Sequence, residues 1–157
     1  MASVENNNTK PKPTILYHYT TLAGKNGIVD NKKINKSIKK KGKADVRHGE
    51  GVYLTELTPD TAKQVIAANN YDGKKLNETV AKFIKNGFID YYIEVEIKED
   101  KKSNLKECFD TQARLIAMNR NVWLYEKKDI NLSDDCDSWE WGETNASKEL
   151  IENDEWM

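Results

Sequence analysis

The 157-residue sequence has few of the residues from which metal and disulfide sites are built. It contains two cysteines and two histidines. Two cysteines are too few for the disulfide framework of a small secreted protein, and two histidines cannot complete a zinc-binding spacing. We therefore expect no redox chemistry and no metal ion.

Long apolar runs are also missing. No stretch of about 18 apolar residues occurs, and residues 1–14 lack the apolar core of a secretory signal. We therefore expect no membrane span. The expected location is the cytoplasm or, for an effector, the cytoplasm of the cell into which it is delivered.

Arginine is scarce, and the basic residues that are present lie unevenly along the chain. The net charge is −1, yet residues 31–43 carry seven lysines and no acid, and residues 134–157 carry nine acids and one lysine. The lysine-rich segment is typical of a solvated loop or of a strip that binds phosphate or nucleic acid. Because only three arginines are present, sequence-specific recognition of DNA is not expected.

The length and the 38% of hydrophobic residues fit a single folded domain. Residues 1–13 contain three consecutive asparagines and two prolines, so we predict that they are disordered. We place the domain at 14–133. The acidic segment 134–157 contains three tryptophans and is predicted to pack on the domain.

The pattern of apolar residues predicts strands that are clustered and helices that lie in the connections between them, which favours the α+β class. Residue 21 is a predicted helix cap, and residues 58–60 resemble a helix start. The predicted strands are 14–20, 51–56, 91–97, 114–118 and 122–125, the predicted helices are 21–29, 61–69 and 74–85, and 32–50 is a predicted loop.

The familiar phosphate-binding, nucleophile and metal motifs do not occur in this sequence. Two short segments remain. Leu16-Tyr17-His18-Tyr19-Thr20 is followed by Gly27-Ile28, and Gly49-Glu50-Gly51-Val52-Tyr53 is followed by Leu54-Thr55. Taken alone, a histidine between tyrosines on a strand is usually structural, and Tyr53 would be a core residue.

Together, in this order, these segments resemble the ADP-ribosyltransferase fold. Within it they are similar to the class named for a His-Tyr-Asp signature, found among polymorphic bacterial toxins and in stand-alone eukaryotic proteins. The resemblance runs from about residue 15 to 133 and includes the strand at 90–95 and the run from 121 to 133. It implies a split β-sheet core with short helices around an NAD cleft.

The resemblance also assigns roles to residues. It implies that His18 hydrogen-bonds the adenosine-side ribose of NAD+, that the backbone of Tyr19 holds the nicotinamide carboxamide, and that Tyr53 stacks on the nicotinamide ring. Thr20, which completes the first motif, and Thr61, which matches a carboxamide-binding hydroxyl residue, are further candidate NAD+-binding residues.

Two positions depart from the family pattern. Asn121 stands where relatives carry an acid, and Gln64 stands where some relatives carry a second stacking tyrosine. A carboxylate at the first position would offset the positive charge that develops as the glycosidic bond opens, so its loss would cost on the order of 100-fold in rate. Glu126 and Asp129 are nearby acids that could replace it.

We therefore expect an NAD+-dependent ADP-ribosyltransferase, of toxin or effector type, in which His18, Tyr53 and Asn121 are the candidate catalytic residues. It would transfer ADP-ribose to a protein or nucleic-acid acceptor of unknown identity, or hydrolyse NAD+. One alternative is a non-catalytic module on the same fold that binds NAD+, ADP-ribose or nucleic acid. Another is a structural α+β domain in which His18 and Tyr53 are only core residues.

Overall fold

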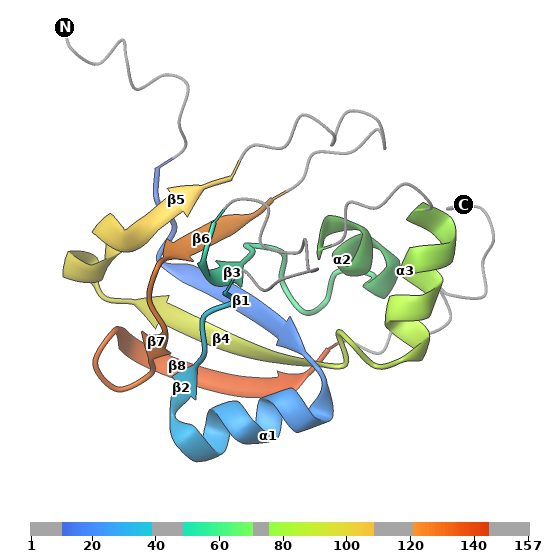
Figure 1. Cartoon of the computed structure of the whole chain (residues 1–157), viewed down its shortest axis with the longest axis horizontal. Helices are drawn as coiled ribbons and strands as arrows, with labels where there is room; N and C mark the ends of the chain where they lie inside the picture. Colours follow the sequence, from blue (N-terminus) through green and yellow to red (C-terminus); the bar gives the residue numbers. More distant parts are fainter. Residues whose placement is uncertain (1–10, 39–48, 71–75, 109–120, 145–157) are drawn as a thin grey trace, which may run out of the picture.

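A computed structural model describes residues 11–38, 49–70, 76–108 and 121–144. Helices and antiparallel sheets alternate irregularly along the chain, and the fold is of the predicted α+β class (Figure 1). The elements are β1 (Ile15–Thr20), α1 (Leu22–Asn31), β2 (Lys33–Ile34), β3 (Gly51–Leu54), α2 (Lys63–Asn70), α3 (Leu76–Lys85), β4 (Tyr91–Ile97), a 3-10 helix (Glu99–Asn104), β5 (Leu105–Glu107), β6 (Trp123–Glu126), β7 (Ile130–Asn131) and β8 (Cys136–Glu143).

The described strands form two three-stranded antiparallel sheets and one short pair. The first sheet has the order β1-β4-β8, and the second has the order β3-β6-β5. The short pair joins β2 to β7. Because β1 and β3 lie at facing edges of the two sheets and pair at a single position, the arrangement is a split sheet.

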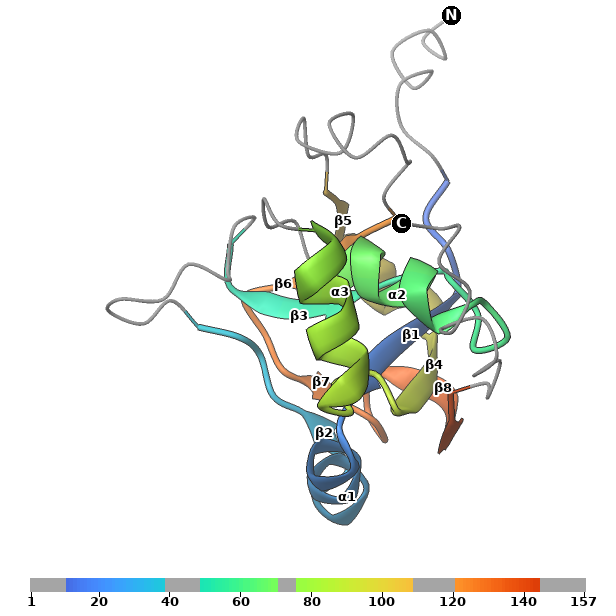
Figure 2. The ribbon, with the colours of Figure 1, turned by 90° about the vertical axis from the view of Figure 1, so that its right-hand side faces the viewer.

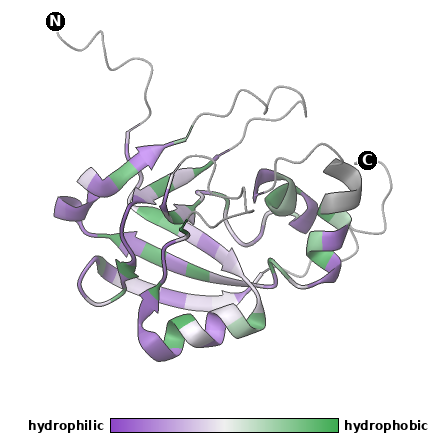
Figure 3. Cartoon of the chain, viewed as in Figure 1, coloured by the Kyte–Doolittle hydropathy of each residue, from purple (hydrophilic) through white to green (hydrophobic). Residues whose placement is uncertain are grey.

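Two hydrophobic clusters hold these layers together. The larger one fills the space between the two sheets and α1, and includes Leu16, Val52, Ile93 and Trp123. The smaller one joins the other face of β1 to α2 and α3, which lie side by side at one end of the molecule (Figures 1 and 2). β4 alternates between buried and half-buried residues, whereas β6 buries three consecutive residues. Figure 3 shows how apolar and polar residues are distributed over the strands.

The clearest sequence patterns predict the elements well. β4 buries Ile93, Val95 and Ile97 and leaves the intervening residues half-buried, as its period-two pattern predicts. Thr21 is the N-cap of α1, because its hydroxyl accepts a hydrogen bond from the main-chain N–H of Gly24 at 2.9 Å. α1 ends where Lys32 adopts a left-handed conformation with φ 57°.

Other boundaries differ from the prediction. Residues 58–60 form a turn in which the N–H of Thr61 donates to Thr58 at 3.0 Å, and α2 begins only at Lys63. The predicted loop 32–50 contains β2, and Ser37 pairs with Gly51. The predicted strand 114–118 lies outside the described residues.

The segment after residue 133 contributes to the first sheet. β8 pairs with β4 from Cys136 to Glu143, so this part of the acidic segment is a strand. The domain limits 14–133 and the disorder of 1–13 stay predictions.

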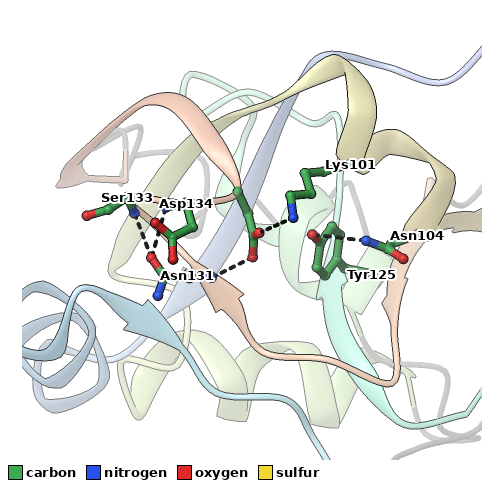
Figure 4. A network of polar contacts seen from close by, with 7 residues as sticks. Lys101, Asn104, Tyr125, Asn131, Ser133 and Asp134 are labelled. Atoms are coloured by element: carbon green, nitrogen blue, oxygen red, sulfur yellow. Dashed lines mark hydrogen bonds and ion pairs between the residues drawn. The ribbon is translucent and has the colours of Figure 1, made fainter.

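The turn between β7 and β8 is closed by polar contacts (Figure 4). The side-chain oxygen of Asn131 accepts hydrogen bonds from the N–H groups of Ser133 and Asp134 at 3.0 and 2.9 Å. The buried carboxylate of Asp135 accepts from the N–H of Asn131 at 2.8 Å and lies 3.5 Å from the ammonium of Lys101. These contacts fix the start of β8.

Candidate functional site

The candidate site begins where β1 and β3 separate. Tyr17 and Thr55 exchange two main-chain hydrogen bonds of 2.8 and 2.9 Å. In a regular antiparallel pair, the next exchange would join Tyr19 to Tyr53. The described residues contain no such exchange, so the two strands part immediately after Tyr17.

The imidazole of His18 occupies the place of the missing exchange. Its Nδ1 lies 3.1 Å from the main-chain oxygen of Tyr53, so Nδ1 carries the proton and donates. Burial lowers the pKa of His18, and the hydrogen bond to Tyr53 opposes that shift. The ring is therefore neutral near pH 7, with Nε2 as an acceptor that has no partner among the described residues.

A second consequence concerns Tyr19. Main-chain groups alternate in direction along a strand, and Tyr17 faces β3, so the N–H and C=O of Tyr19 also face β3. With the oxygen of Tyr53 bonded to His18, those groups of Tyr19 have no partner among the described residues. They can bond a ligand amide.

A pocket of about 270 Å³ opens beside His18. Residues of α1 and of the β2 region line it. Among the described lining residues, Lys33 is the one that carries a charge. A side chain built on Gly27 would meet nothing within 4 Å of its Cβ. The pocket is thus bordered by small residues, two asparagines and one cation (its lining residues are His18, Ala23, Gly24, Gly27, Ile28, Asn31, Lys33, Ile34 and Asn35).

The backbone conformation at both glycines of the Gly-x-Gly-x-Tyr motif favours glycine. Gly49 has φ 116° and Gly51 has φ 149°, both in the region that favours glycine. A Cβ on Gly51 would lie 2.2 Å from the main-chain oxygen of Tyr125 on β6. The half-buried side chain of Tyr53 donates from its hydroxyl to the oxygen of Gly49 at 2.5 Å, which orients its ring.

The other predicted NAD+-binding residues lie on β1 and on the segment that follows β3. Thr20 lies at the end of β1, with its hydroxyl against Gly24 of α1. Thr61 lies in the segment that leads from β3 to α2 and is half-buried. The hydroxyl of Tyr19 donates to the oxygen of Leu57 at 2.6 Å, so this segment is tied to β1.

Asn121 lies on the other side of Thr55, in a dense polar cluster. Its side-chain oxygen accepts from the hydroxyl of Thr55 at 3.1 Å and from the N–H of Glu56 at 2.7 Å. Its main-chain N–H and C=O are both bonded to the buried side chain of Asn69, at 2.6 and 2.9 Å. The three candidate catalytic residues that the resemblance implies, His18, Tyr53 and Asn121, therefore lie around the end of the β1–β3 pairing.

The same cluster contains the carboxylate of Glu56, which belongs to neither of the two short sequence motifs. Oε2 of Glu56 accepts from Nδ2 of Asn121 at 2.9 Å and from Nε1 of Trp123 at 3.0 Å. The two other acids considered in the sequence lie elsewhere. Glu126 faces Lys106 on β5 at 3.7 Å, and Asp129 accepts from the N–H of Lys36 at 2.7 Å.

Two general features of the described residues complete this account. Within the ranges that the structure describes, no group of three or more His, Cys, Asp or Glu side chains could hold a metal ion. No helix in those ranges is long and apolar enough to cross a membrane.

Comparison with known proteins agrees with the geometry. A family model described as HYD1 signature containing ADP-ribosyltransferase, with a name that marks it as toxin-type, matches residues 16–113. The match contains His18 and Tyr53 and ends before Asn121. No curated protein and no solved structure matches the chain. Since the match covers more than half of the sequence, the chain belongs to the family of toxin-type ADP-ribosyltransferases that contain the HYD1 signature.

Proposed function

We propose that this protein cleaves NAD+ at the bond between nicotinamide and ribose, and transfers ADP-ribose to a protein or nucleic-acid acceptor or to water. The observation that carries the proposal is the split at His18. It leaves the main-chain N–H and C=O of Tyr19 without partners in the described chain. A primary carboxamide offers one acceptor and two donors, so it can bond both groups.

The two sides of the split suit the two halves of NAD+. On the α1 side, Nε2 of His18 can accept a hydrogen bond from a ribose hydroxyl, and the pocket of about 270 Å³ has room for part of a nucleoside. The ammonium of Lys33 at the pocket lies 3.7 Å from the Asp129 carboxylate in an exposed ion pair, and a phosphate could compete with that carboxylate for it. The resemblance to the family implies that the ring of Tyr53 and the hydroxyl of Thr61 contact the nicotinamide.

In this reaction the bonding electron pair leaves with the nicotinamide nitrogen, which becomes neutral. The ribose becomes an oxocarbenium-like cation that the acceptor attacks, and the acceptor loses a proton. Such a reaction depends on positioning and on negative charge near the ribose more than on a strong base.

The test is incubation with NAD+, with and without cell extract. We expect release of nicotinamide and, by mass spectrometry, an adduct of ADP-ribose on the protein or on an acceptor. Binding of NAD+ with no release and no adduct would favour the alternative of a non-catalytic module on the same fold. That alternative is motivated by Asn121, an uncharged amide at the position where the resemblance leads us to expect an acid.

A further inference from the structure

The polar cluster at the end of β3 contains both an amide and a carboxylate, and their hydrogen bonds differ in kind. The side-chain oxygen of Asn121 already accepts two hydrogen bonds, from Thr55 and Glu56, which matches the two lone pairs of a carbonyl oxygen. With both main-chain groups also bonded to Asn69, Asn121 is fixed in place by the protein.

Glu56 is held in a different way. Two N–H donors, from Asn121 and from the buried Trp123, meet at the same carboxylate oxygen. Hydrogen bonds from N–H donors favour the ionised form of a carboxyl group and fix its direction. Glu56 is nevertheless half-buried, so the charge is held at the boundary between core and surface.

The position of Glu56 also fits the site. It directly follows Thr55, whose main chain pairs with Tyr17 at the last contact before the split. It lies within the 16–113 match to the family model, together with His18 and Tyr53, whereas Asn121 does not.

We propose that Glu56 supplies the negative charge that Asn121 lacks, and that Asn121 is a positioning residue that orients the Glu56 carboxylate. This inference rests on the proposed function, since the charge would stabilise the oxocarbenium-like state of NAD+ cleavage. The carboxylate stays ionised throughout and takes no proton and no covalent bond.

The decisive variant is Glu56→Gln. Because these two donors meet at one oxygen, the carbonyl oxygen of glutamine can keep both of these bonds while the charge is removed. We expect nicotinamide release to fall about 100-fold, with NAD+ affinity and melting temperature close to those of the wild type. The matched control is Glu96→Gln on β4, where the glutamate accepts a bond from Ser138 at 2.8 Å and where we expect no change in rate.

A charge swap tests the same idea if Glu56→Gln perturbs folding. The single variant Asn121→Asp places two carboxylates where a bond of 2.9 Å now joins amide to acid, so their charges repel. The double variant Glu56→Gln with Asn121→Asp moves the charge to residue 121 and restores a donor between them. We expect the double variant to release nicotinamide at least ten times faster than Glu56→Gln does. An unchanged rate would contradict the assignment of the charge to Glu56.

The role of Asn121 has its own readout. Asn121→Ala should lower kcat and leave KM unchanged, because the variant releases the Glu56 carboxylate without touching the groups that bind NAD+. An equal rise in KM would show that Asn121 itself binds NAD+. If the wild type releases nicotinamide and Glu56→Gln is fully active, the inference fails and the proposed function stands. If the wild type neither binds nor cleaves NAD+, the proposed function fails and the inference with it.

Discussion

The two sides of the β1–β3 split are built in opposite ways. On the α1 side, small residues such as Gly24 and Gly27 border an open pocket, and Nε2 of His18 has no partner among the described residues. On the other side, Asn69, Thr55, Asn121 and Glu56 form a network in which each side chain is bonded to another. The α1 side has room for a ligand, whereas the other side holds the Glu56 carboxylate in a fixed orientation.

This difference predicts which property each side controls. Changes that fill or alter the pocket should act on the affinity for NAD+, because the fold does not depend on what lies in it. Changes in the polar network should act on stability and on rate. The following experiments test that division, starting with the largest expected effect.

Asn69→Ala should be the most damaging change. Asn69 is fully buried and bonds the hydroxyl of Thr55 and both main-chain groups of Asn121, so alanine leaves several buried polar groups without partners. We expect a loss of about 3 kcal/mol in the free energy of unfolding, measured with denaturant. The control is Asn70→Ala, which changes the next and exposed residue of α2. An equal loss in both variants would contradict the importance of the network.

Gly27→Leu should abolish NAD+ binding without harming the fold. At a hundredfold excess over its dissociation constant, NAD+ should stabilise the wild type by about 2.7 kcal/mol. The Cβ of residue 27 meets no atom within 4 Å, so leucine can enter the pocket and block it. Gly27→Ala is the control, and we expect it to raise unliganded stability by about 0.5–1 kcal/mol while binding persists. The measurement is the melting temperature with and without NAD+. If NAD+ raises the melting temperature of the leucine variant as much as that of the wild type, NAD+ does not bind in this pocket.

His18→Asn should weaken NAD+ binding by a smaller factor. The asparagine amide can keep the donor to the oxygen of Tyr53, but it lacks the acceptor at the position of Nε2. We expect about tenfold weaker binding, or about 1.4 kcal/mol, with unliganded melting close to that of the wild type. Calorimetric titration with NAD+ measures this, and a large loss of unliganded stability would favour a purely structural role for His18.

The smallest effect concerns pH. The pKa of His18 is lowered in the folded protein, so below about pH 6.5, its ordinary pKa, the unfolded chain binds the proton more readily than the folded one. Stability from this group is therefore complete above that pH and is lost as the pH falls through it, by at most about 1.4 kcal/mol per pH unit. We would measure the free energy of unfolding of the wild type and of His18→Asn between pH 7.5 and 5.5. It should decrease more steeply with falling pH in the wild type. Parallel curves would contradict an imidazole that is neutral in the folded protein.

Local patterns predicted much of the fold. The alternation along β4 and the cap at Thr21 are properties of neighbouring residues, and both elements appear as predicted. β8 was not predicted as a strand. Its sequence alternates only around Trp139 and Trp141, and Cys136 is its one buried residue, so the period-two signal is short and weak. The two-residue strands β2 and β7 are too short to produce a pattern.

Short motifs that are continuous in the sequence led to two candidate residues that prove to be neighbours, although their roles stay predictions. His18 and Tyr53 belong to short motifs, and the structure joins them by a bond of 3.1 Å. Glu56 is one of 26 acids, and what distinguishes it is a pair of donors 65 and 67 residues away. Because such contacts depend on the completed packing of β3 against β6, residue types and spacing do not reveal them.

The central place of β4 in the first sheet affects how the protein is made. β1, which carries His18, leaves the ribosome first, but its main-chain partner is β4, and β4 also needs β8 on its other edge. Most of these pairings join residues far apart in the chain, and such contacts make folding slow. The sheet can form only after β4 and β8 have been synthesised, which is late in translation. A nascent chain should therefore lack the NAD+ site that we propose until nearly all of the described strands have been synthesised.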